Sequence, residues 1–225
     1  VALAGVFGGA VSGIYIASQS TLEQNRKLSL EKAYLEVFGL AETDQLTAEE
    51  IGEMVAAQID RSETLRDPET GWEFELLQAF TDADQAQLKG YGFRFRGLGF
   101  WAPIEGLLAL DPTLERTIGL AILEQKETPG LGARIADDFF VSQFEDGIRV
   151  TPPPTAGELC LIISSSIPPA GSAQAERHVN AITGATQTCM AMERILNEHL
   201  IRFRRAMNTW QQQERQQGGP AENAR

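Results

Sequence analysis

The most informative stretch of this chain is Asn180-Ala181-Ile182-Thr183-Gly184-Ala185-Thr186. From Gln187 through Met207 apolar residues recur at helical spacing, so a helix is predicted to begin beside Thr186. The first turn of a helix presents unpaired N–H groups and the positive end of the dipole, which favour an anion. The small Gly184 and Ala185 leave the Thr186 hydroxyl approachable. The run therefore predicts an anion site at Thr186 or an ordinary loop with a threonine cap.

Two other motifs come earlier in the chain. One is Glu127-Thr128-Pro129-Gly130-Leu131-Gly132, in which Pro forms a turn and the glycines tolerate positive φ. The other is Gly97-Leu98-Gly99-Phe100-Trp101-Ala102-Pro103-Ile104-Glu105-Gly106, followed by Ala109-Leu110-Asp111. By residue type alone, Trp101 fits a core position as well as a ligand contact. A tight glycine loop is also how a backbone approaches a bound group, so the structural and functional interpretations are compatible.

Together these motifs resemble the FMN-binding domain family. Residues 183–186 are similar to its [ST]-G-A-T flavinylation site, and residues 127–132 match its E-T-P-G-L-G hallmark. The 97–106 stretch resembles the branch formed by the C subunits of the sodium-pumping NADH:quinone oxidoreductases (Nqr), with the G subunits of Rnf complexes close behind. The resemblance is strong over roughly residues 90 to 200. The family usually has Asp where this chain has Asn180, which is a departure from the motif that the attaching transferase reads.

The resemblance implies one cofactor, FMN, joined to Thr186 by a phosphoester bond. It implies that Trp101 and Leu131 lie near the isoalloxazine ring and that Glu127 and Thr128 supply polar contacts around it. The residues expected to bind the cofactor are Thr186, Thr183, Gly184, Ala185, Glu127, Thr128, Leu131, Gly132 and Trp101. No catalytic residue and no metal ligand are predicted, because Glu127 has no nucleophile or metal cluster near it in the sequence.

The function implied by the resemblance is electron relay through covalent FMN, in one component of a membrane-bound, ion-translocating oxidoreductase. The expected partners are the other membrane subunits of that complex and, for maturation, a flavin transferase. The chain is not expected to be a self-sufficient enzyme, since no G-x-G-x-x-G turn stands between a strand and a helix. Alternatives are the G subunit of an Rnf complex, a free-standing membrane-anchored flavin module that senses or relays redox state, and a cofactor-free envelope scaffold.

The N-terminal run Val1 to Ser18 contains no charged residue and predicts a transmembrane anchor over residues 1–20. At about 1.5 Å per residue it reaches roughly 27 Å, close to a hydrocarbon core of about 30 Å. Its G-x-x-x-G spacings, at Gly5, Gly9 and Gly13, are typical of helix packing and predict a membrane partner. The alternative is a secretory apolar region. The resemblance implies a single pass through the bacterial inner membrane, with the domain on the periplasmic side.

The remaining patterns predict an α+β fold with a mixed or antiparallel sheet and packed helices. Helices are expected from Leu22 to about Leu40, from Thr47 to near Arg61 and over 133–140. Strands are expected at 74–77, 91–96, 107–110, 117–124 and 158–166, with an extended connection at 151–154. The predicted division is an anchor (1–20), a membrane-proximal helical and strand region (21–90), an FMN-binding domain (91–208) and a disordered tail (209–225).

Composition excludes some classes of function. Of the 225 residues 43% are hydrophobic and 22% charged, which is typical of a globular chain, and the net charge of −12 argues against binding nucleic acid. His178 and His199 lack neighbours at ligand spacing, so surface or cap roles are predicted. Cys160 and Cys189 are too few and too far apart for a disulfide framework, although a single bridge stays open.

Overall fold

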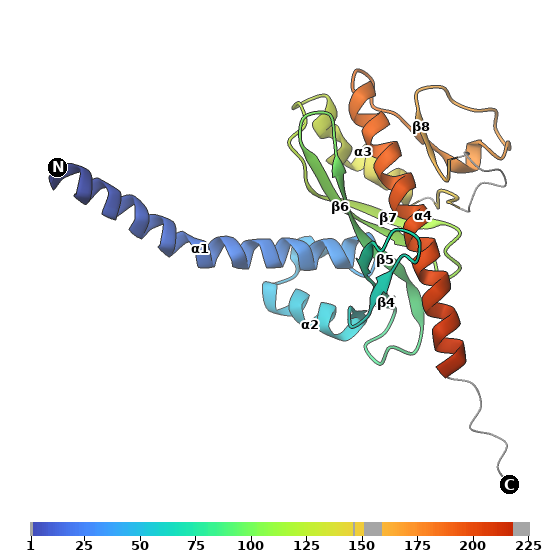
Figure 1. Ribbon diagram of the computed structural model, residues 1–225, viewed down its shortest axis with the longest axis horizontal. Helices are drawn as coiled ribbons and strands as arrows, with labels where there is room; N and C mark the ends of the chain where they lie inside the picture. The colour runs from blue at the N-terminus through green and yellow to red at the C-terminus, as the bar shows by residue number, and fades with distance from the viewer. Residues whose placement is uncertain (1, 146, 151–158, 218–225) are drawn as a thin grey trace, which may run out of the picture.

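The computed structural model describes the backbone of residues 2–145, 147–150 and 159–217, and the side chains of residues 19, 21–145, 147–150 and 159–216. Within these residues a five-stranded antiparallel sheet lies between helices on its two faces (Figure 1). The predicted α+β class is thereby confirmed, with the main sheet antiparallel throughout.

The main sheet has the strand order β1-β4-β5-β6-β7. Its strands are β1 (Ile59–Asp60), β4 (Leu77–Phe80), β5 (Leu88–Leu98), β6 (Pro103–Leu110) and β7 (Thr117–Glu124). A hairpin of β2 (Thr64–Arg66) and β3 (Glu73–Glu75) stands beside it, and β8 (Ile162–Ser164) pairs in parallel with β9 (His178–Asn180). The main sheet thus joins strands from the predicted 21–90 region to strands from the predicted 91–208 region.

The helices are α1 (Ala2–Val37), α2 (Ala48–Gln58), α3 (Asp138–Val141) and α4 (Thr186–Gln217). Short 3₁₀ turns span Thr43–Gln45, Gly132–Ala136, Ser142–Phe144 and Ala175–Arg177. The predicted start of α2 is confirmed by a capping box, in which Thr47 and Glu50 satisfy each other's backbone N–H groups. The predicted end of α1 is confirmed to within three residues: the helix ends at Val37, Gly39 follows with a φ of 59°, and Leu40 N–H donates to the Leu35 carbonyl at 2.9 Å.

Two apolar cores flank the sheet. Leu108 and Leu110 of β6 belong to the core under α4, whereas Leu107 and Ala109 belong to the core under α1 and α2. Because this part of β6 is covered on both faces, its sequence from Leu107 to Leu110 is continuously apolar rather than alternating. On the α1 side, a Cβ added at Gly119 would lie 2.1 Å from the Val37 carbonyl oxygen, so a glycine is needed where α1 meets β7.

Most side chains of the predicted anchor, residues 1–20, lie outside the described part of the structure. Its backbone from Ala2 onward continues into α1, which projects from the body (Figure 1). In the described part of the chain, no helix combines the length and the apolar character needed to cross a membrane.

Several local predictions need correction. Residues 209–217, predicted to begin a disordered tail, continue α4, because their Gln, Glu and Arg residues are good helix formers; residues 218–225 lie outside the described chain. The strand predicted at 158–166 is confined to β8, and the predicted helix at 133–140 is divided between a 3₁₀ turn and α3. The extended connection predicted at 151–154 lies outside the described residues.

His199 also differs from its prediction as a surface or cap residue. It is 3% exposed and lies within α4, where the rings of Trp72, Phe74 and Phe95 contact it edge-on. Its Nδ1 pairs with the Ile195 carbonyl at 2.8 Å, and burial lowers the pKa of its imidazole. A neutral His199 with a satisfied N–H is therefore part of the core under α4.

Candidate functional site

Three loops meet at the start of α4: one between β5 and β6, one after β7, and one between β9 and α4 (Figure 1). They enclose a pocket of about 190 Å³. Its lining residues come from all three motifs and are Phe100, Thr128, Leu131, Gly132, Gly184, Ala185, Thr186, Gln187 and Thr188. The fold thus brings together the stretches that the sequence singled out.

Thr186 is the first residue of α4 and is exposed. The chain enters the helix through Gly184, whose φ of 82° is favourable only for glycine, and through Ala185, which has no side-chain oxygen to cap the helix. The first helical bond runs from Cys189 N–H to Ala185 C=O at 3.0 Å. The N–H groups of residues 186–188 consequently have no acceptor within the helix, and these residues line the pocket.

The loop after β7 forms the opposite wall. Leu131 N–H and Ala133 N–H both donate to the Thr128 carbonyl at 3.1 Å, and Gly130, inside this turn, takes a φ of 74°. This tight turn leaves Leu131 44% exposed at the rim, where a Cβ added at Gly184 would lie 3.2 Å from its Cδ2. Leu131 therefore links the loop of residues 127–132 to the loop of residues 183–186.

Glu127 lies behind the pocket and is only 4% exposed. Its Oε1 accepts from Trp101 N–H at 3.0 Å, and its Oε2 accepts from the Thr188 hydroxyl at 2.7 Å. A Cβ added at Gly99 would lie 2.5 Å from Glu127 Oε1, and one added at Gly132 would lie 2.4 Å from Thr188 Oγ1. The glycines of two motifs are therefore needed because the chain packs closely around this carboxylate and its partner.

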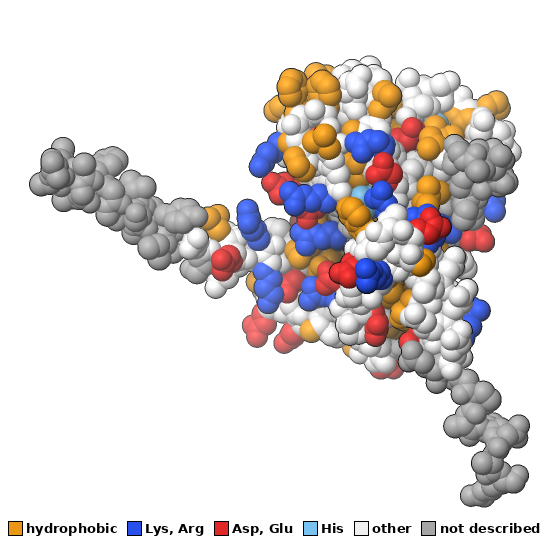
Figure 2. Space-filling model, viewed as in Figure 1, with side chains coloured by type: hydrophobic (Ala, Val, Ile, Leu, Met, Phe, Trp, Pro, Cys, Tyr) orange, Lys and Arg blue, Asp and Glu red, His pale blue; other side chains and the backbone are white. Residues whose placement is uncertain are grey.

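An apolar patch borders the pocket. Trp101 is 65% exposed, which excludes a core position, and its Nε1–H donates to Thr128 Oγ1 at 3.0 Å. Phe100 is 51% exposed and contacts the Trp101 ring edge-on at 4.9 Å between centroids. Leu98 and Met190 are also mostly exposed. Figure 2 shows hydrophobic side chains at the upper end of the body, where α4 begins. Exposed aromatic groups beside a pocket are typical of a binding surface.

The structure separates the predicted binding residues into four groups. Thr128, Leu131, Gly132, Gly184, Ala185 and Thr186 line the pocket. Trp101 is bonded to its rim, whereas Glu127 is buried behind it and Thr183 is exposed outside the lining. Sequence reasoning missed Phe100, Gln187 and Thr188. The position of Gln187 and Thr188 in the first turn of the predicted helix was the signal that could have identified them.

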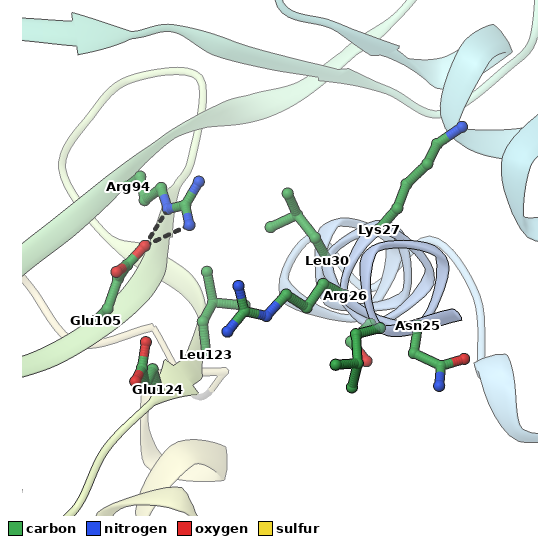
Figure 3. Close-up of a pocket in the computed structure, with 10 residues that line it drawn as sticks. Asn25, Arg26, Lys27, Leu30, Arg94, Glu105, Leu123 and Glu124 are labelled. Atoms are coloured by element: carbon green, nitrogen blue, oxygen red, sulfur yellow. Dashed lines mark hydrogen bonds and ion pairs between the residues drawn. The ribbon is translucent and has the colours of Figure 1, made fainter. Parts of the chain in front are cut away.

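A larger groove of about 660 Å³ lies where α1 leaves the sheet (Figure 3). Arg94 and Glu105 form an ion pair on its sheet side, and Arg26 points from α1 toward Leu123. Of the residues in the three motifs, Glu105 alone lines this groove, and it is already paired with Arg94. The larger groove is therefore not assigned as the functional site on size alone. The smaller pocket contains the motif residues, including the Thr186 hydroxyl.

The two cysteines of the described chain show no sign of chemical activation. Cys160 and Cys189 are both free and buried, and burial raises the pKa of each thiol, so neither is an activated nucleophile. Cys189 Sγ accepts a hydrogen bond from Ile182 N–H at 3.3 Å. Among the described residues no group of three or more His, Cys, Asp or Glu side chains could hold a metal ion.

Comparison with known proteins supports the class that the fold and site define. Residues 99–200, which contain the whole pocket, match the model of the FMN-binding domain family. The resemblance to that family is confirmed over this part of the chain.

The more particular likeness is to the C subunits of Na(+)-translocating NADH-quinone reductases. That of Chlamydia caviae is 31% identical over 118 residues, and the match covers 48% of this chain and 37% of that protein. The chain thus matches well under half the length of this relative. The Pseudomonas aeruginosa protein of the same name is 24% identical over 222 residues, covering 83% of each chain.

Solved structures show the same fold. The crystal structure of Shewanella oneidensis NqrC has a TM-score of 0.64 at 19% identity, covering 81% of this chain and 96% of that one. The crystal structure of the corresponding protein from Parabacteroides distasonis has a TM-score of 0.64 at 20% identity, covering 84% and 96%.

Proposed function

We propose that this chain carries FMN covalently on Thr186 and relays electrons within an Nqr-like, ion-translocating NADH:quinone oxidoreductase. One observation carries the proposal: the E-T-P-G-L-G loop and the T-G-A-T loop close a single pocket at the start of α4. The match of residues 99–200 to the FMN-binding domain family supports FMN as the occupant. The names of the relatives favour the Nqr branch over the Rnf branch.

The charge of the pocket suits a phosphoester. Among its described lining residues there is no Lys or Arg, so the unpaired N–H groups and the dipole of α4 are what face an anion there. A free phosphate monoester carries about −1.5 to −2 charge at neutral pH, whereas a diester carries only one negative charge. Weak positive potential and an exposed hydroxyl therefore favour a phosphate that is already esterified to Thr186.

The size of the pocket indicates which part of the cofactor it would hold. At about 190 Å³ it is smaller than the roughly 300–1,000 Å³ of sites that enclose a whole ligand. It would hold the phosphate end, while the exposed Phe100, Trp101 and Leu131 would contact the apolar ring. When bound, FMN supplies the redox chemistry, and the side chains of this protein orient it and exclude water from one face.

Attachment needs an activated donor. The Thr186 hydroxyl oxygen would attack the phosphorus on the flavin side of a flavin dinucleotide, forming the Oγ–P bond as the phosphoanhydride bond breaks. The nucleotide leaving group takes the bonding electron pair, and a base of the flavin transferase takes the hydroxyl proton. The resulting ester prevents loss of FMN to solvent and fixes its distance to the next redox carrier.

The proposed setting is the bacterial inner membrane, with residues 1–20 as a single-pass anchor and the domain on the periplasmic side. The uncharged N-terminal run and its glycine spacing support this, and they also support contact with other membrane subunits. We retain residues 91–208 as the FMN-binding region and 21–90 as the membrane-proximal region.

The direct test is co-expression with a flavin transferase, followed by denaturing electrophoresis and peptide mass analysis. The wild-type chain should fluoresce and carry one FMN, Thr186→Val should carry none, and Thr183→Val should keep it. Fluorescence that persists in Thr186→Val, or that maps to Thr183, contradicts the assignment. Rapid NADH oxidation by the purified full chain would contradict the relay role.

A further inference from the structure

We infer that Glu127 is a positioning residue: it orients the first turn of α4, and so the Thr186 hydroxyl, through Thr188. This inference rests on the proposed attachment at Thr186. It also replaces the expectation that Glu127 contacts the flavin ring. The Glu127 side chain is absent from the pocket lining, and each of its oxygens accepts a hydrogen bond from the chain itself.

The hydrogen bond from the Thr188 hydroxyl to Glu127 joins residues that are 61 positions apart. Both residues are buried, with Thr188 3% and Glu127 4% exposed. Thr188 lies in the same turn as Thr186, two residues farther along. Ala185 supplies no side-chain cap to the helix. The hydrogen bond of the Thr188 hydroxyl therefore connects this turn to the loop of residues 127–132. A hydrogen bond to a buried carboxylate is among the stronger ones in proteins, so it restrains the turn.

The same carboxylate fixes the rim of the pocket. Glu127 Oε1 holds the backbone of Trp101, whose side chain then reaches Thr128. Gly99 and Gly132 leave the space in which these groups meet. One buried carboxylate thereby sets the distance between the acceptor hydroxyl and the apolar rim, which is the distance that a flavin donor must match.

Substitutions can separate positioning from ring contact. Gln at position 127 can keep both ties, because its oxygen accepts from Trp101 N–H while its NH₂ donates to Thr188 Oγ1. Glu127→Gln should therefore retain the wild-type attachment rate within about threefold. Thr188→Val keeps the shape but loses the hydroxyl, and attachment should slow about tenfold. Thr188→Ser should restore it.

A matched control is Asp67→Asn, which weakens another buried side-chain tie to α4, at Arg205, far along the helix from Thr186. If general destabilisation slowed attachment, this variant would slow it too. We expect Asp67→Asn to be modified at the wild-type rate.

A second measurement does not depend on the flavin. Amide hydrogen exchange of the unmodified full chain should show about tenfold faster exchange at Cys189 and Met190 in Thr188→Val, and no change there in Asp67→Asn or Thr188→Ser. Unchanged exchange in Thr188→Val overturns the inference. So does a Glu127→Gln variant that abolishes attachment while Thr188→Val does not. A wild-type chain that takes no FMN overturns the proposed function, and the exchange result still decides whether the tie exists.

Discussion

The two ends of α4 are held in different ways. Toward its C-terminal end, Arg205 forms a two-point ion pair with the fully buried Asp67, and Phe203 packs against the rings of Phe74 and Phe93. At its N-terminal end the helix has no cap at Ala185, and an exposed apolar patch surrounds it. Because α4 is anchored at the Arg205 end, its first turn can present unpaired N–H groups and a hydroxyl to the pocket.

The largest expected effect is on the scaffold side. Phe203→Ala removes a fully buried ring whose centroid lies 4.4 Å from that of Phe93, and should lower the free energy of unfolding by about 3–5 kcal/mol. Thermal or denaturant unfolding of the purified chain measures this. A loss below about 1 kcal/mol would show that α4 is not anchored through this core.

Asp67→Asn should cost less, about 1.5–3 kcal/mol, and should change the response to acid. Burial by itself would raise the pKa of Asp67, but hydrogen bonds from Arg205, Thr70 and the Glu69 N–H lower it to about 2. A carboxyl with a depressed pKa contributes stability above its unfolded pKa of about 3.9, and this is lost as pH falls toward 2. Unfolding between pH 5 and about 2 should therefore be less pH-dependent in the variant; equal slopes would contradict this.

Two glycines near the start of α4 differ in the space around them. Gly132→Ala places a Cβ 2.4 Å from Thr188 Oγ1 and should cost about 1–3 kcal/mol while slowing flavin attachment. Gly130→Ala meets no atom within 4 Å and should cost only about 1–2 kcal/mol, from its positive φ. Attachment rates measured beside unfolding curves separate the two. Equal attachment rates would mean that the space around Thr188 does not matter.

The smallest effect on stability is expected at the rim. Trp101→Ala removes a side chain that is 65% exposed, so the free energy of unfolding should change by about 0.5 kcal/mol or less. The absorption spectrum of attached FMN should shift nonetheless, because an aromatic neighbour is lost. An unchanged spectrum would place the ring elsewhere.

Local signals were enough for much of the fold. The capping box at Thr47, the turn at Gly39 and the paired apolar runs of β6 and β7 are encoded by neighbouring residues, and the structure confirms them. Predictions failed where tertiary contacts or helix propensity decide the outcome. Helix α4 continues through a polar tail to Gln217. His199 is buried at helical spacing from Ile195 and Phe203, a signal that the search for ligand spacing overlooked.

The Thr-Gly-Ala-Thr motif at 183–186, the glycine loop at 127–132 and the helix that begins at Thr186 were readable from the sequence, because each depends on residues within one short segment. That these segments form one pocket, that Trp101 is exposed, and that Glu127 faces Thr188 rather than the pocket became clear only from the packed fold. These outcomes depend on residues far apart along the chain. The hydrogen bond between Thr188 and Glu127 joins residues 61 apart, and it depends on how the sheet and α4 pack, which no local pattern records.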